Sequence, residues 1–144
     1  MEKINSFKDL MAWQEGHKLV LMIYEITKSF PKDEMFGLTS QMRRAAVSIT
    51  SNAAEGFARQ SYKEKAQFYA IANGSATELQ NQLEVSKDVG YLSKEKYDTA
   101  YELSIKTHKI INGLIKGCRL RLSFPLIPYS LLPYFLFLIP PPPP

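Results

Sequence analysis

Basic side chains are the residues of this 144-residue sequence that are best suited to bind a ligand. Arg43 and Arg44 are neighbours, and Arg59 and Lys63 follow about four turns later, around the far end of the same predicted helix. Guanidinium and ammonium groups bind phosphate, so these four residues can form a clamp on a nucleic-acid backbone. One interpretation of the sequence is therefore a phosphate-binding function.

The competing interpretation of the same arginines is structural, and we favour it. Adjacent helical residues point about 100° apart, so Arg43 and Arg44 cannot both face one partner squarely. The chain also holds many carboxylates, and Glu55 or Glu84 can pair with an arginine across the fold or across a subunit boundary. We expect one of the two arginines to be engaged inside the assembly.

A second basic group lies at the end of the last predicted helix and is the most one-sided charge run in the chain. It consists of Lys106, Lys109, Lys116, Arg119 and Arg121. Such a run can be the electrostatic footprint of an RNA-binding surface, or it can complement the negative end of the helix dipole. The sequence favours neither reading over the other.

The charge of the whole chain is weak evidence for a nucleic-acid partner. The formal net charge is +4, but without Arg119 and Arg121 only 16 basic residues stand against 14 acidic ones. A surface for nucleic acid would therefore be a local patch and not a property of the entire protein.

Catalytic patterns are missing from the sequence. It has no glycine-rich phosphate loop, no paired carboxylates at a defined spacing and no nucleophile beside a histidine, so we expect no enzyme. Asn52 and Glu55 lie among small residues and suggest acid–base chemistry. No second carboxylate is placed near them by spacing, so we expect a buried hydrogen-bonded network that sets helix register.

The potential metal ligands are few. His17 and His108 both fall in apolar stripes and can meet across the first and fourth helices, but a metal site needs further ligands that the sequence does not supply. We expect both to be satisfied histidines near the core, with no metal and no cofactor. The single Cys118 excludes an internal disulfide and fits a reducing cytoplasm, and the charged N-terminus lacks the apolar segment of a secretion signal.

Four helices must position these residues, at about 6–30, 37–60, 62–90 and 93–118. Ser6 is a candidate N-cap for the first helix, and Phe30-Pro31 ends it. Ser61 opens a capping box with Glu64, Gly90 favours a helix stop, and Ser93 caps the last helix. Short connections between four helices indicate an antiparallel up-down-up-down bundle formed by residues 1–118.

The first helix carries apolar residues on more than one side. One row, at heptad-like spacing, contains Leu10, Trp13, His17, Val20, Tyr24 and Thr27. A second row contains Leu19, Met22, Ile23, Ile26 and Phe30. A chain this short cannot cover both rows by itself, so we expect the extra face to meet another subunit.

The second helix is made largely of small residues, among them Ala45, Ala46, Ala53 and Gly56. Such a helix cannot fill a core with its own side chains, so larger neighbours must pack against it. We expect it to be a central packing element.

Residues 119–144 form an apolar, proline-rich tail that we do not expect to fold on the bundle. From Leu122 onward the tail has no charged residue, and it ends in five prolines from Pro140. Pro125, Pro128 and Pro133 interrupt any helix across it. The prolines therefore favour an irregular or polyproline-like extension over a membrane helix. An altered reading frame is a further explanation of this composition.

Several short motifs, specific only in combination, give the chain a family resemblance over about residues 7–118. They are Trp13, Phe30-Pro31, Phe36-Gly37-Leu38, Ser40-Gln41, Arg43-Arg44-Ala45-Ala46, Asn52, Ala54-Glu55-Gly56, Gly90-Tyr91-Leu92 and Asn112-Gly113-Leu114. With these residues the chain resembles the bacterial four-helix-bundle family associated with intervening sequences of 23S ribosomal RNA genes. Thr50, where the family usually has proline, and Ala53, where it has a larger aliphatic residue, depart from the pattern.

The resemblance implies a left-handed four-helix bundle that assembles into a ring-shaped homo-oligomer, a pentamer. It implies no known reaction. Relatives of similar fold that act beside reverse transcriptases in diversity-generating retroelements are thought to bind nucleic acid, which makes RNA binding the inherited expectation.

These observations together predict a cytoplasmic, non-enzymatic, all-α homo-oligomer. Its expected role is that of an RNA-associated accessory or scaffold protein. The alternative is a structural assembly module whose partner is another protein and which binds no nucleic acid. RNA bound to the purified protein would distinguish the two.

Overall fold

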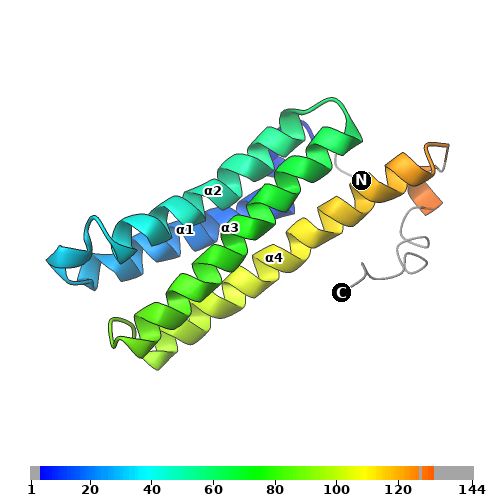
Figure 1. The fold of residues 1–144 in the computed structure, drawn as a ribbon. Helices are drawn as coiled ribbons and strands as arrows, with labels where there is room; N and C mark the ends of the chain where they lie inside the picture. Colours follow the sequence, from blue (N-terminus) through cyan, green and yellow to red (C-terminus); the bar gives the residue numbers. More distant parts are fainter. Residues whose placement is uncertain (1–3, 127, 132–144) are drawn as a thin grey trace.

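Four long helices form the fold in the computed structural model, which describes residues 4–126 and 128–131. They are α1 (Met11–Ile26), α2 (Leu38–Ala58), α3 (Tyr62–Asp88) and α4 (Lys94–Ser123). Successive helices run in opposite directions, and α1 and α3 each contact both α2 and α4 (Figure 1). The described residues contain no β-strand. The all-α four-helix bundle expected from the sequence is confirmed.

Local cap residues set most helix ends. The Ser61 hydroxyl accepts the Glu64 backbone N–H and donates to the Glu64 carboxylate, and the Ser93 hydroxyl accepts the Lys96 N–H. Gly90 follows α3 with φ of +83°, in the left-handed region that L-residues rarely adopt. These three signals act where the sequence places them.

The N-terminal segment is less regular than the single helix expected over residues 6–30. Ser6 and Asp9 form a capping box around a short 3-10 turn at Phe7–Asp9, and Leu10 is then extended before α1 begins at Met11. The extended backbone at Leu10 allows its side chain to be buried. A second 3-10 turn, Thr27–Ser29, follows α1 and precedes Pro31.

The last helix is longer than predicted. The expected end at Cys118 is wrong, because α4 continues to Ser123 and buries Leu120 at 2% exposure. Residues 119–122 are arginines and leucines, which are good helix formers, and the first residue that cannot continue the helix is Pro125. The residues from 132 onward in the predicted tail lie outside the described part of the chain. Within the described residues, no helix has both the length and the hydropathy to cross a bilayer.

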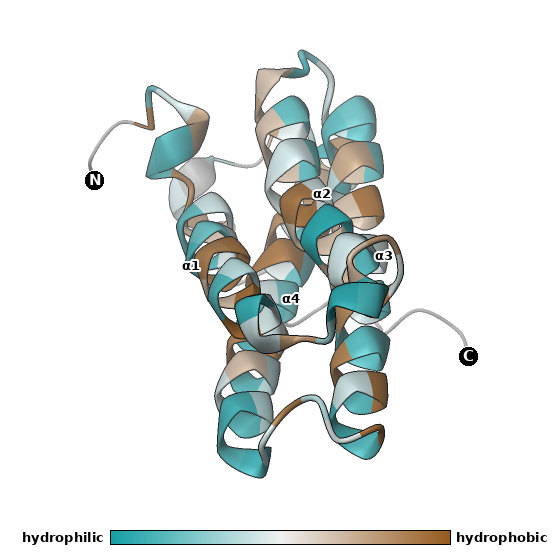
Figure 2. Cartoon of the chain, turned by 90° about the vertical axis from the view of Figure 1, so that its left-hand side faces the viewer, coloured by the Kyte–Doolittle hydropathy of each residue, from teal (hydrophilic) through white to brown (hydrophobic). Residues whose placement is uncertain are grey.

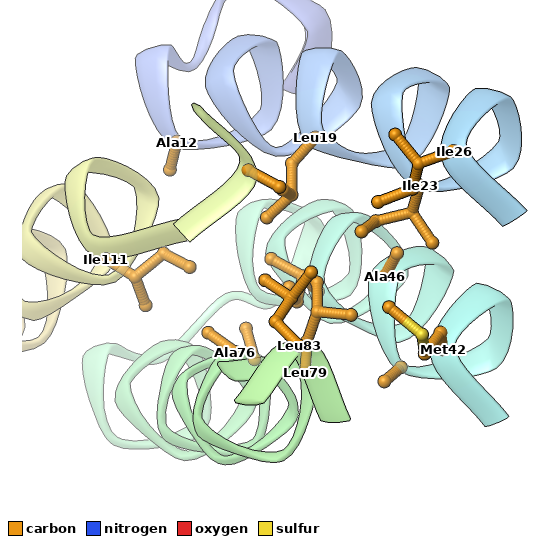
Figure 3. Packing of buried hydrophobic residues seen from close by; sticks show 14 of the residues in the cluster. Ala12, Leu19, Ile23, Ile26, Met42, Ala46, Ala76, Leu79, Leu83 and Ile111 are labelled. Atoms are coloured by element: carbon orange, nitrogen blue, oxygen red, sulfur yellow. The ribbon is translucent and has the colours of Figure 1, made fainter. Parts of the chain in front are cut away.

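The core is formed by large side chains of all four helices. The fully buried ones include Leu19, Ile23, Met42, Ile49, Leu79, Leu83 and Ile111, and Figure 3 shows most of them pointing into the space between the helices. Hydrophobic and hydrophilic stretches alternate along each helix, as a surface bundle helix requires (Figure 2).

The small residues of α2 let its neighbours approach closely, as predicted. A Cβ atom at Gly56 would lie 2.5 Å from Cε1 of Tyr69, so the buried Tyr69 ring of α3 rests directly on the α2 backbone. A Cβ at Gly16 of α1 would lie 3.1 Å from Cγ2 of Thr50. Ala45, Ala46 and Ala53 of α2 are also buried.

The two apolar rows of α1 have different roles. Leu19, Ile23, Ile26 and Phe30 of the second row lie in the core, whereas the middle of the heptad-like row faces outward. Trp13 and Val20 are partly buried, and His17 and Tyr24 are exposed. Apolar side chains beside this row are also exposed, with Met11 at 62% and Leu21 at 59%. Among the residues that the structure describes, no segment therefore covers the outer face of α1.

Candidate nucleic-acid interface

Arg43 is bound inside the subunit. Its Nε donates to Thr27 Oγ1 at 2.9 Å, and its guanidinium lies 4.8 Å from the centre of the Tyr24 ring. The expectation that one of the paired arginines is engaged internally agrees with this geometry. The expected carboxylate partner is wrong, because Arg43 uses a hydroxyl group and an aromatic ring of α1.

The two carboxylates proposed as partners bind other groups. Glu55 accepts a hydrogen bond from Arg59, with 2.5 Å between Arg59 Nη2 and Glu55 Oε2. Glu84 accepts hydrogen bonds from Lys87, at 2.6 Å, and from the Tyr97 hydroxyl. Basic residues three or four positions later in the same helix pair with these carboxylates, because their side chains lie on the same helix face.

Arg44 points to the surface and has no hydrogen bond or ion pair in the part of the chain that the structure describes. It lies between two hollows. One, of about 560 Å³, is lined by Tyr24, Met35, Phe36 and Val47 among others. The other, of about 300 Å³, is lined by Gln41, Ala45, Ser48 and Glu78. Its surroundings are thus apolar on one side and polar on the other.

The four residues of the proposed clamp are not brought together. Arg59 pairs with Glu55 and lies over the Phe68 ring, 4.6 Å from its centre. Lys63 is exposed at the start of α3. Arg44 and Arg59 are 15 residues apart on α2, which corresponds to about 22 Å along the axis. One phosphate group cannot bridge that distance.

The basic run of α4 separates into paired and unpaired members. Lys106 binds Glu15 of α1 at 3.0 Å, and Lys18 binds the same carboxylate at 2.8 Å. These two hydrogen bonds, with Lys18 first, hold the pKa of the largely buried Glu15 below its ordinary value. Lys106 therefore fastens α4 to α1 and is not free for a ligand.

Most of the other members of the basic run of α4 lie on the protein surface. Lys109, Lys116 and Arg119 are exposed and make no ion pair within the described residues, and Arg121 is partly buried. No acidic residue follows Glu102 in the sequence. Because α4 extends to Ser123, only Arg121 lies in its last turn. Dipole complementation fades beyond the last turn, so it does not explain Lys109 and Lys116.

The expected polar network exists with a different membership. Asn52 Nδ2 donates to the Ser48 carbonyl at 2.8 Å and to the Ser48 hydroxyl at 3.1 Å. The Ser48 and Ser75 hydroxyls are hydrogen-bonded at 2.8 Å, which links α2 to α3. Glu55 does not belong to this network, since it is exposed and bound to Arg59. The amide, and not the carboxylate, contributes to helix register.

His17 and His108 lie in different environments, because His17 faces outward on α1 and His108 is partly buried on α4. His17 is exposed and stacks on Trp13 with 4.7 Å between ring centres, so its expected place near the core is wrong. It belongs to the row of α1 that faces outward. His108 is partly buried, and its Nδ1 lacks a hydrogen-bond partner among the described residues. No group of three or more His, Cys, Asp or Glu residues in the described chain can hold a metal ion.

The seam between α3 and α4 was missed by the sequence analysis. Asn73 Nδ2 donates to Asn112 Oδ1 at 2.6 Å, and the Tyr97 hydroxyl of α4 donates to Glu84 of α3. The Tyr97 and Tyr101 rings stack at 5.2 Å. The sequence feature that could have predicted this seam is a row of polar residues at helical spacing on each of the two helices. The two rows can be matched only after the helices are aligned antiparallel.

Comparisons with known proteins place this geometry in context. The profile of a family described as 23S rRNA-intervening sequence protein matches residues 8–113. A crystal structure of a protein of unknown function from the S23 ribosomal protein family of Bacteroides thetaiotaomicron is similar in fold, with a TM-score of 0.67 and 22% identity. The similarity covers 74% of this chain and 99% of that one. No curated protein matches the sequence.

Proposed function

The chain belongs to the 23S rRNA-intervening sequence protein family, and we propose that it is a non-catalytic, oligomeric protein that associates with RNA as an accessory or scaffold. The observation that carries the proposal is the group of uncompensated cations on α4. Lys109, Lys116 and Arg119 are exposed without a carboxylate partner in the described chain. Their setting is proposed to be the cytoplasm.

Helix spacing supports a shared surface for these cations. Lys109 and Lys116 are seven residues apart and so lie on one side of α4, and Arg119 follows Lys116 by three. Unpaired cations on one side of a rod can follow a phosphate backbone and release its counterions. Arg59 and Lys106 are left out of this surface because each is ion-paired with a carboxylate, and Arg43 is left out because the Thr27 hydroxyl and the Tyr24 ring already hold its guanidinium.

Self-association is the second part of the proposal. The outward row of α1 and the neighbouring Leu21 and Met11 present apolar surface that no other element among the described residues covers. Burial of such a surface against further copies fits the expected ring-shaped homo-oligomer, a pentamer. In the proposed assembly, contacts between subunits would use the α1 side of the bundle and leave the outer face of α3 and α4 free.

The test is purification of the full chain followed by measurement of native mass, absorbance at 260 nm and RNA binding. We expect nuclease-sensitive absorbance and an affinity for RNA that falls steeply with salt. The combined substitution Lys109→Gln, Lys116→Gln and Arg119→Gln should reduce the slope of log affinity against log salt by about two to three. The matched control replaces three exposed lysines elsewhere, Lys8, Lys32 and Lys96.

An unchanged slope in the α4 variant, or an equal loss in the control, would contradict the proposed surface. Protein that assembles but never binds RNA would favour the alternative function, a structural assembly module with a protein partner. One observation supports that alternative. The hollow at the α1–α2 end exposes Phe36 at 94% and Met35 at 58%, which is typical of a protein contact.

A further inference from the structure

Two polar rows face each other along the seam between α3 and α4. Asn73 and Gln80 are seven residues apart on α3, and His108 and Asn112 are four apart on α4. The hydrogen bond between Asn73 and Asn112 joins the rows, and the bond between Tyr97 and Glu84 joins the same two antiparallel helices about three turns away on α3 and four turns away on α4. Amide and imidazole groups thus lie close together on one side of the bundle.

The seam has unused hydrogen-bonding capacity. Asn73 Oδ1, Gln80 Nε2 and His108 Nδ1 are buried, and none has a partner in the described part of the chain. Buried polar atoms without partners are uncommon in proteins, because each one has lost its hydration without replacement. All three side chains are only partly buried, so a change of rotamer can present these atoms to a ligand.

The unpaired cations of α4 border the same seam. Lys109 precedes Asn112 by three residues and Lys116 follows it by four, so both lie beside the amide on the helix surface. Between them, a Cβ atom built at Gly113 meets nothing within 4 Å, which leaves the helix backbone open to close approach. Polar groups and phosphate-binding groups are therefore neighbours.

The surface lacks the character of a protein contact. The large hydrophobic side chains that are exposed lie on the other helices and near the chain ends, and none lies on α4 between Lys94 and Arg121. The rings of Tyr97 and Tyr101 on α4 stack on each other and carry hydroxyl groups. A hydrophilic seam flanked by cations complements an anionic polymer with polar bases better than an apolar protein surface.

We propose that the α3–α4 seam binds unpaired bases of single-stranded RNA, with Gln80, His108 and the Asn73–Asn112 pair on the base edges and Lys109 and Lys116 on the phosphates. Single strands are the fitting form, because their unstacked bases can be splayed out and hydrogen-bonded along their edges, whereas side chains cannot read the deep major groove of an A-form duplex. This inference rests on the proposed RNA association and assigns its base-contacting site.

The test compares a short fluorescent single-stranded RNA of mixed sequence with the same strand in a duplex. The variant is Gln80→Met combined with His108→Leu, which keeps side-chain size and removes the polar atoms. It should bind the single strand about tenfold more weakly, while the duplex affinity and the salt slope stay as in the wild type. Gln67→Ala, an exposed amide on another side of α3, is the matched control.

Thermal stability separates a lost contact from a damaged fold. The variant should melt at the same temperature as the wild type or higher, because it replaces unpartnered polar atoms by apolar ones. Unchanged single-strand affinity with a normal salt slope would overturn the seam and leave the RNA association intact. Equal wild-type affinity for duplex and single strand would also overturn it. A wild-type protein that binds neither RNA would remove the proposed function together with the inference.

Discussion

The contact between Gly56 and Tyr69 offers a measurement of how closely α2 and α3 are packed. The perturbation is Gly56→Ala, which places a methyl group 2.5 Å from Tyr69 Cε1 and 2.8 Å from Cδ1. Both distances are far below van der Waals contact, and the Tyr69 ring is only 4% exposed, so it has little room to move. Overpacking of this kind costs about 1–3 kcal/mol.

The higher helix propensity of alanine stabilises the same variant, so a control substitution is needed to measure that gain separately. Alanine is favoured over glycine by about 1 kcal/mol in a helix interior. Gly74 lies in the middle of α3, where an added Cβ meets nothing within 4 Å, so Gly74→Ala should show the propensity gain alone. The two variants should therefore differ in unfolding free energy by about 1–3 kcal/mol, with Gly56→Ala the less stable. Gly56 is close to the end of α2, where its own propensity gain is smaller, and this widens the difference.

The assay is urea unfolding of both variants beside the wild type at equal protein concentration, since assembly adds to apparent stability. Equal unfolding free energies for Gly56→Ala and Gly74→Ala would refute the close packing of Tyr69 on the α2 backbone.

Three further predictions concern charge, assembly and ionisation. The pKa of Glu15 lies below its ordinary value of 4.5, so the ionised carboxylate stabilises the fold at any pH above 4.5. Glu15→Gln should therefore lower the melting temperature at neutral pH. The difference in melting temperature from the wild type should shrink as the pH falls below 4.5. Leu21→Glu should reduce the native mass measured by light scattering, whereas the exposed control Gln67→Glu should not; an unchanged mass would exclude the α1 face from self-association. Burial raises the pKa of Tyr69 to about 12, so the folded state should lose stability as the pH rises above 10. Tyr69→Phe should weaken that loss, as followed by circular dichroism.

The helix ends and the core of α2 could be predicted from the sequence because they depend on near neighbours along the chain. Ser61, Ser93 and Gly90 act through backbone groups within a few residues of themselves. The small residues of α2 could be assigned to packing because a helix with so many of them must be approached closely by larger side chains of its neighbours. The end of α4 follows the same rule: Pro125 is the first helix breaker after Cys118, so the helix continues past the change of composition at residue 119.

The roles of the charged and aromatic residues depended on contacts between helices. The sequence shows two apolar rows on α1, but only the positions of α2 and α4 decide that Leu19 and Ile23 enter the core while His17 faces outward. It shows two neighbouring arginines, but only the approach of α1 gives Arg43 a hydroxyl partner and leaves Arg44 without one among the described residues.

What the sequence determined by itself was the family, the four helices and most of their ends, because periodicity and capping are local properties of the chain. What only the tertiary structure decided was which cations are already paired and which polar rows meet. An ion pair such as Lys106 with Glu15 joins residues that are 91 positions apart, and no local pattern specifies such a contact. The candidate RNA surface consists of the groups that remain after those long-range pairings are made.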